Sequence, residues 1–184
     1  MSIKLGSSWN YGAKSGVEYT RFARDKDTLK DGLTFSYFER LDTSNNLIPE
    51  YFGKNSGYYF TLIDLDGSET NYLPYAFWKD SASKGTSWNN TGSVSYPSLG
   101  KVPILIESTE VDDNVTLYHT DSTYKNLIHV HSNIKATLSN LRVGTLDIWF
   151  RKGLGVVRQE ADISILGAFK LQYTDSLLHY HIEP

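Results

Sequence analysis

Two pairs of histidines have a spacing that could bind a metal ion, His129-x-His131 and His179-x-His181. Residues i and i+2 of a β-strand project from the same face, so each pair could offer two imidazoles to one ion. His119 could supply a further ligand. The pattern is common by chance, and the same histidines could simply be exposed on two strands. His129 and His131 are the candidate metal ligands.

A second candidate is an acidic segment in which Asp64, Asp66 and Glu69 have a calcium-like spacing. It lacks the rest of an EF-hand loop. Asp66-Gly67 follows an apolar run, and Asp-Gly is a hairpin-turn signal because glycine accepts a positive φ angle. The turn is the main interpretation, and calcium binding is the alternative.

Aromatic residues surround the segment that is richest in Ser, Asn and Gly. The candidate ligand-binding residues there are Tyr75, Trp78, Trp88 and Tyr96. Exposed rings could stack on a sugar or clamp a peptide. The competing interpretation places the same rings in the core, where aromatic side chains are chiefly buried.

Catalytic signatures are absent from the sequence. There is no G-x-S-x-G and no H-E-x-x-H, and Gly153-x-Gly155 lacks the third glycine of a nucleotide-binding loop. We expect no cofactor, and the sequence favours a protein without enzymatic activity. A hydrolase whose carboxylates meet only in the folded chain stays open as an alternative.

Composition narrows the class of partner. The 184 residues carry a net charge of −3 and no cysteine. This charge does not fit a nucleic-acid binder, and the missing cysteine excludes disulfides and thiolate chemistry. No run of apolar residues approaches the roughly 20 that a transmembrane helix needs. Glycan, lipid or protein ligands remain open.

The elements that must position these residues are strands. Period-two alternation recurs from Val17–Ala23 to Phe169–Tyr173, with turns such as Asp31-Gly32 between the strands. The pattern predicts a single antiparallel all-β domain over residues 1–184, either a sandwich or a strongly curved, open-barrel-like sheet. The only helical candidate is the segment Pro74–Lys79. Residues 80–100 are expected to form a long loop or an irregular edge.

Two features refine this prediction. Ile148–Glu160 is expected to form a hairpin whose bend contains Gly153 and Gly155. Gly6–Asn10 and Gly85–Asn89 resemble each other, because in each a tryptophan directly follows a Gly-Ser/Thr-Ser run. They are expected to mark two equivalent strand starts where the tryptophan covers a core edge.

The hairpin Ile148–Glu160 resembles a "WYAKGVGLVK-E" hairpin of small envelope lipoproteins and secreted proteins from bacteroidete-type bacteria. Three further segments fit the same pattern in order: Leu5–Tyr11, Leu73–Trp88 and Ser122–Val130. The chain departs from the pattern at Arg151, where alanine is usual, and it lacks a lipobox cysteine.

The resemblance implies an extracytoplasmic β domain, periplasmic, at the surface or secreted, whose lipid anchor would precede Met1. A cytoplasmic location is the alternative. The family's biochemical role is unassigned, so the resemblance implies no catalytic residues.

These observations favour a non-catalytic β domain with a binding or structural role, and a carbohydrate- or lipid-binding module is the first alternative. The two ligand classes predict different structures. A curved sheet that encloses a continuous apolar cavity would favour lipid, and a flat exposed strip of aromatic rings would favour glycan.

Overall fold

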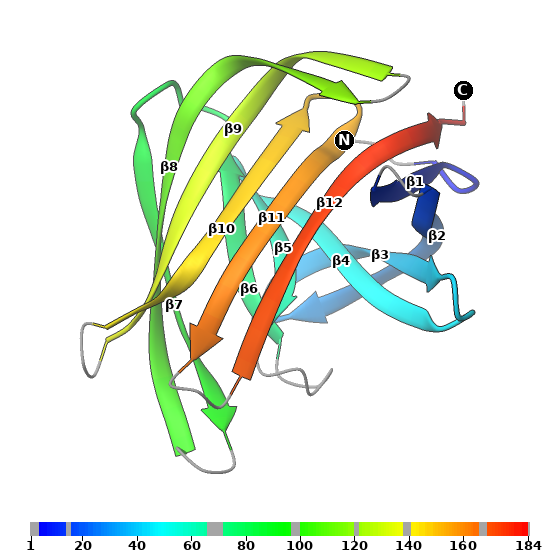
Figure 1. The fold of residues 1–184 in the computed structure, drawn as a ribbon. Coiled ribbons are helices and arrows are strands. Elements are labelled where there is room, and N and C mark those ends of the chain that lie inside the picture. The colour runs from blue at the N-terminus through cyan, green and yellow to red at the C-terminus, as the bar shows by residue number, and fades with distance from the viewer. Residues whose placement is uncertain are drawn as a thin grey trace.

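The computed structural model shows an all-β protein and describes residues 4–13, 16–65, 72–96, 100–119, 122–137, 141–165 and 169–183. Its twelve strands form one antiparallel sheet that curls into an almost closed barrel (Figure 1). The predicted all-β class is therefore confirmed, and of the two predicted shapes the chain adopts the strongly curved sheet. Within the described residues, no helix is long and apolar enough to cross a bilayer.

The strands are β1 (Ser8–Ala13), β2 (Gly16–Lys30), β3 (Leu33–Asp42), β4 (Leu47–Asn55), β5 (Tyr58–Asp64), β6 (Tyr72–Lys79), β7 (Ser87–Tyr96), β8 (Gly100–His119), β9 (Ser122–Ala136), β10 (Leu141–Arg151), β11 (Gly155–Ile165) and β12 (Phe169–His181).

The order across the sheet is β6-β5-β4-β3-β2-β1-β12-β11-β10-β9-β8-β7. Strands that follow each other in the chain are therefore neighbours everywhere except between β6 and β7. The first and last strands pair with each other, with Trp9 opposite Tyr180. Because consecutive strands pair through short turns, each one is positioned by local connections, which keeps the entropy of loop closure small.

Alternation of side chains builds the barrel interior. In β8 the residues Val102, Ile104 and Ile106 are buried while their neighbours are partly exposed, and in β9 Val130 and Ile134 repeat the pattern. Successive side chains of a strand point to opposite faces, so these residues share the inner face. Period-two sequence patterning thus becomes a continuous apolar core.

The barrel is sealed by side chains where β6 and β7 meet. The indole Nε1 of Trp88 donates a hydrogen bond of 2.7 Å to the main-chain oxygen of Ala76, and the amide of Ala76 donates to Oδ1 of Asn90. The side chain of Leu73 lies over Gly92, where a Cβ atom would come within 1.9 Å of Leu73 Cδ1. Between β6 and β7, these side-chain contacts take the place of the main-chain hydrogen bonds that join all other adjacent strands of the sheet.

Two local expectations differ from the structure. The segment 74–79, the only helical candidate, lies in strand β6. It is rich in aromatic residues that favour strands, and Pro74 is tolerated there because β6 is the last strand of the sheet. For residues 80–100 the expected loop is wrong and the expected edge is correct, because strand β7 (Ser87–Tyr96) lies at the other end of the sheet and pairs with β8 along its whole length. Main-chain pairing makes this polar segment a strand.

Other local expectations are confirmed. Asp31 and Gly32 form the turn between β2 and β3, and the β10–β11 hairpin bends at Lys152–Leu154. Gly6 and Gly85 each have a positive φ angle two residues before a strand. The tryptophans that follow, Trp9 and Trp88, are both buried and both donate their indole N–H to a distant main-chain oxygen. The two segments are therefore structurally equivalent.

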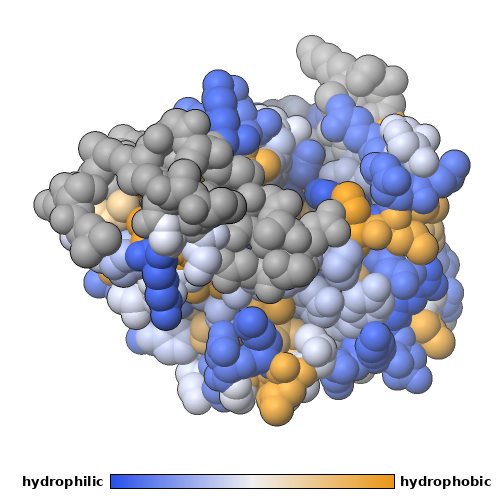
Figure 2. Space-filling view, turned by 90° about the horizontal axis from the view of Figure 1, so that it is seen from below, coloured by the Kyte–Doolittle hydropathy of each residue, from blue (hydrophilic) through white to orange (hydrophobic). Residues whose placement is uncertain are grey.

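Strands β8 and β9 form the longest hairpin, which bends over the ends of β10 and β11 (Figure 1). Near its tip, Oη of Tyr124 donates to the main-chain oxygen of Leu178 in β12 at 3.2 Å. On the face of the molecule seen from below, hydrophilic and hydrophobic residues are interspersed over the described surface (Figure 2). The largest gathering of aromatic side chains lies instead inside the barrel.

Candidate functional site

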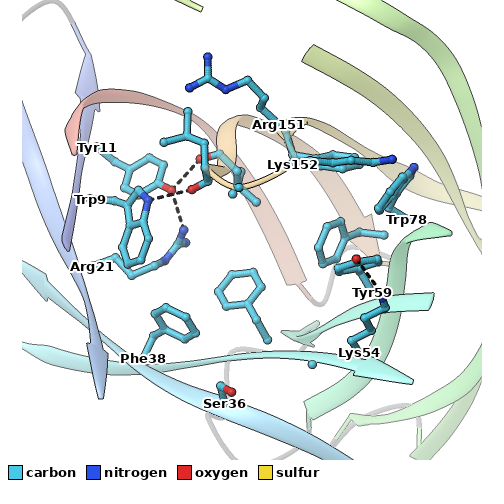
Figure 3. A pocket seen from close by; sticks show the side chains of 18 residues that line it. Trp9, Tyr11, Arg21, Ser36, Phe38, Lys54, Tyr59, Trp78, Arg151 and Lys152 are labelled. Atoms are coloured by element: carbon cyan, nitrogen blue, oxygen red, sulfur yellow. Dashed lines mark hydrogen bonds between the residues drawn. The ribbon is translucent and has the colours of Figure 1, made fainter. Parts of the chain in front are cut away.

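A cavity of about 400 Å³ lies inside the barrel (Figure 3). Eight of the eighteen described residues that line it are aromatic: Trp9, Tyr11, Phe38, Phe52, Tyr59, Phe77, Trp78 and Phe150. They come from six different strands, so only the folded barrel brings them together. Small-molecule sites in proteins have volumes of about 300–1,000 Å³ and mostly apolar walls with a few placed polar groups. The cavity fits this description in size and chemistry.

The turn between β10 and β11 covers one side of the cavity and is held there by strand β1. Nε1 of Trp9 donates to the main-chain oxygen of Leu154 at 2.9 Å, and Oη of Tyr11 donates to that of Val156 at 2.8 Å. The hydrogen bonds span 145 residues of sequence. Because both donors are buried, these hydrogen bonds fix the turn over the cavity.

The opposite wall is built around Trp78. Its ring lies near the rings of Tyr59 and Phe150, with centroid distances of 4.8 and 5.1 Å. Its Nε1 donates to Oε2 of Glu110 at 3.1 Å. Burial raises the pKa of the Glu110 carboxyl, and this hydrogen bond partly offsets that effect. Glu110 thus fixes the orientation of the indole that faces the cavity.

Arg21 forms the polar end of the cavity and is only 4% exposed. Its Nε donates to Oε2 of Glu50, and its Nη1 donates to Oη of Tyr11 at 2.7 Å. The guanidinium lies between two rings, with Cζ 4.7 Å from the centroid of Tyr11 and 5.0 Å from that of Phe52. Burial acts to lower the pKa of Arg21, but Glu50, Tyr11 and Tyr19 together outweigh burial and raise it. Arg21 is therefore charged.

Near Arg21, three buried or partly buried polar side chains form a hydrogen-bond network. Oη of Tyr19 donates to Oδ2 of Asp175 at 3.1 Å, and Nε2 of Gln159 donates to the same oxygen at 3.2 Å. Burial raises the pKa of Asp175 above its usual value, and the two hydrogen bonds lower it only in part. Burial also raises the pKa of Tyr11 to about 12, so its hydroxyl keeps its proton at neutral pH.

Two lysines stand at the exposed side of the cavity. Nζ of Lys54 lies 2.6 Å from Oδ2 of Asp80 and donates to Oη of Tyr59 at 2.8 Å. These hydrogen bonds raise the pKa of Lys54. Nζ of Lys152 lies 4.7 Å from the ring centroid of Trp78. The cavity therefore has an aromatic body, a buried cation at one end and exposed cations at the other.

The predicted aromatic residues have different positions. Trp78 lines the cavity, whereas Tyr75 and Trp88 are buried in the core. Oη of Tyr75 shares a hydrogen bond of 2.7 Å with Oγ of Ser132, and Trp88 seals the meeting of β6 and β7. Tyr96 ends strand β7, and its side chain lies outside the described part of the structure. Of the three described rings, Trp78 alone faces the cavity.

The candidate metal ligands His129 and His131 lie together on the outer face of β9. Nε2 of His129 and Nδ1 of His131 both contact Oδ1 of Asp147, at 2.7 and 2.9 Å. His129 also stacks on the ring of Trp149, with centroids 4.2 Å apart. Among the residues described here, no group of three or more His, Cys, Asp or Glu side chains could hold a metal ion. The imidazoles hydrogen-bond to a carboxylate instead.

The remaining predicted sites are exposed or lie partly outside the described residues. His179 and His181 are exposed on β12, and His181 contacts Glu183 at 3.0 Å. Asp64 ends strand β5, but Asp66 and Glu69 lie outside the described residues, so the calcium alternative has no structural outcome.

Most residues of the cavity were not predicted from the sequence. One signal could have identified Arg21: in the alternating segment Val17–Ala23 it falls on the same face as Tyr19 and Ala23. A charged residue on the apolar face of a strand requires a buried partner or a function. Trp9 could have been found from its likeness to Trp88.

A comparison of the chain with models of protein families found no match, and comparisons with curated proteins and with solved structures found none either. The geometry of the cavity is therefore the basis for assigning a function.

Proposed function

We propose that the protein binds an apolar or amphipathic small molecule inside its barrel, with a lipid-like molecule as the ligand class. The observation that carries this proposal is the cavity of about 400 Å³ with eight aromatic residues in its wall. A curved sheet around an apolar cavity is the arrangement that favours lipid over glycan, since a glycan site presents exposed rings on a flat surface.

The rigidity of the cavity supports the proposal. The indole N–H groups of Trp9 and Trp78 and the hydroxyl of Tyr11 each donate a buried hydrogen bond. Their acceptors are the main-chain oxygen of Leu154, the carboxylate of Glu110 and the main-chain oxygen of Val156, respectively. Binding to a preformed site avoids the entropy cost of ordering side chains. Apolar surface removed from water then contributes about 25 cal/mol per Å² to affinity.

Fluorescence titration with N-phenyl-1-naphthylamine tests the proposal, because this neutral dye brightens in apolar sites. We expect saturable binding to the wild-type protein and competition by decanol. Ser36→Phe should abolish binding, because Ser36 lines the cavity and a phenyl ring there would occupy the space of the ligand.

Thr34→Phe is the matched control. Thr34 lies two residues earlier on β3, is exposed and does not line the cavity. This variant should bind the dye as the wild type does. Failure of the folded wild type to bind, or equal binding by folded Ser36→Phe, would contradict an interior site.

A location in the cell envelope is a further part of the proposal and rests on the resemblance of Ile148–Glu160 and three other segments to bacteroidete-type lipoproteins. The gene sequence upstream of the codon for Met1 tests it. A signal peptide that ends in a lipobox would support the location. Translation that begins at Met1, with no signal peptide encoded upstream, would contradict it.

A further inference from the structure

The charges in the cavity wall have one sign. Arg21, Lys54, Arg151 and Lys152 line the cavity, and no aspartate or glutamate is among the described residues that do so. Glu50 pairs with Arg21 and Asp80 pairs with Lys54, but neither acid lines the cavity. In a low-dielectric cavity, a wall that carries only positive charges raises the local concentration of anions.

Arg21 has donor capacity that its protein partners do not use. A guanidinium has five N–H donors. Nε binds Glu50 and Nη1 binds Tyr11, whereas Nη2 has no hydrogen bond to any residue in the described part of the chain. Figure 3 shows the Arg21 side chain beside Tyr11 at the edge of the space between the rings. A ligand atom in the cavity could therefore accept a hydrogen bond from Arg21.

Two acids share the positive charge of Arg21 and Arg40. The Glu50 carboxylate forms ion pairs with Nε of Arg21 and, at 4.0 Å, with Nη1 of Arg40. Asp175 interacts electrostatically with the same two arginines and accepts hydrogen bonds from Tyr19 and Gln159. Neither acid lines the cavity, so Arg21 is the charged group that the cavity presents at this end.

The remaining basic residues lie at the exposed side. Lys152 is exposed, and the Lys54 side chain is 43% exposed. Arg151 extends away from the aromatic walls (Figure 3). These residues can attract an anion from solvent, while the rings between them and Arg21 suit an apolar chain.

We propose that the ligand is an anionic amphiphile, such as a carboxylate with an aliphatic or aromatic body, whose acid group binds the guanidinium of Arg21. Its apolar body lies among Phe38, Phe52, Tyr59 and Phe150. The inference rests on the proposed function, because it assigns the ligand class of the same cavity. Charge-assisted hydrogen bonds to a guanidinium are shorter and stronger than neutral ones.

Displacement of N-phenyl-1-naphthylamine by three ligands of equal chain length tests the inference: decanoate, decanol and decylammonium. Each is used at neutral pH, decanol below its solubility limit and the two ions below their micelle concentrations. We expect decanoate to bind about tenfold more tightly than decanol, as one charge-assisted hydrogen bond predicts. Decylammonium should bind most weakly. Equal affinities of decanoate and decanol would overturn the anionic assignment and leave the interior site intact, whereas binding of none of the probes would contradict the proposed function itself.

A paired substitution identifies the head-group site. Arg21→Met alone would leave Glu50 buried without its partner, so Arg21→Met/Glu50→Met replaces both charges with apolar groups, a change that proteins often tolerate. In this variant decanoate and decanol should bind equally. The control is Arg24→Met/Glu39→Met, which removes the outer ion pair of β2 and β3 and should keep the preference for decanoate. Retention of the preference in folded Arg21→Met/Glu50→Met would contradict the role of Arg21.

Discussion

The indole N–H of Trp9 donates a hydrogen bond of 2.9 Å to the main-chain oxygen of Leu154. This bond joins β1, near the start of the chain, to the turn between β10 and β11. Both residues line the cavity. A single buried contact therefore connects the N-terminal strand with the turn that shapes the proposed binding site.

Trp9→Phe should lower the free energy of unfolding by about 1–3 kcal/mol, because it leaves the buried oxygen of Leu154 without its donor. Urea denaturation measures the change. Trp149→Phe is the control, since the Trp149 indole donates no hydrogen bond to a described residue and its ring is only partly buried. An equal loss in both variants would show that ring size, and not the hydrogen bond, carries the effect.

Asp175→Asn should stabilise the protein at neutral pH, on the order of 1 kcal/mol, because the neutral amide avoids the cost of a buried charge. Its amide oxygen can still accept from Tyr19 and Gln159. Burial raises the folded-state pKa of Asp175 above the unfolded value, so the wild type loses stability as pH rises through that interval. The gain from Asp175→Asn should therefore shrink as pH falls through this interval and be smallest below about 4, the unfolded pKa of aspartate.

Urea denaturation of the wild type and of Asp175→Asn at several pH values checks this prediction. A gain that grows toward acid pH, or a loss of stability at neutral pH, would contradict it.

Asp147→Asn should have the opposite effect on stability to Asp175→Asn. Burial acts to raise its pKa, but hydrogen bonds from His129 and His131 outweigh burial and lower it. A lowered folded-state pKa gives stability that is complete above the unfolded value of about 4 and is lost as pH falls through the folded-state value. Asp147→Asn should therefore cost roughly 1–2 kcal/mol at neutral pH and progressively less in acid.

The same urea series measures the Asp147 effect, with Asp162→Asn as the control because Asp162 is an exposed residue of the neighbouring strand β11. A cost that is independent of pH would contradict the proposed hydrogen bonds to the carboxylate.

Much of the strand arrangement could be predicted from the sequence, because alternation and turn residues act locally. Asp31-Gly32 and the bend at Gly153 each determine a hairpin within a few residues. Segment 74–79 was mispredicted as helical, and the sequence predicts only a long loop or an irregular edge for the region that contains strand β7. The strand conformation of both segments depends on pairing partners and on their places at the two ends of the sheet, which no local pattern reveals.

The candidate site was largely hidden for the same physical reason. Trp78 belonged to the predicted aromatic group, but Trp9, Phe52 and Phe150 meet it only because the sheet closes into a barrel. Curvature depends on how twelve strands twist and pack together, and period-two patterning is the same for a sandwich and a barrel. Tyr75 and Trp88 could not be distinguished from Trp78 without this closure.

The central claim, that the barrel interior is the binding site, is tested most directly by NMR titration of ¹⁵N-labelled protein with decanoate. The glycine amides and tryptophan indoles report on separate regions. Gly53, Gly153, Trp9 and Trp78 line the cavity, whereas Gly32 does not. We predict saturable shifts of the four cavity signals with no change at Gly32; shifts confined to residues outside the cavity, or no shifts at all, would contradict the claim.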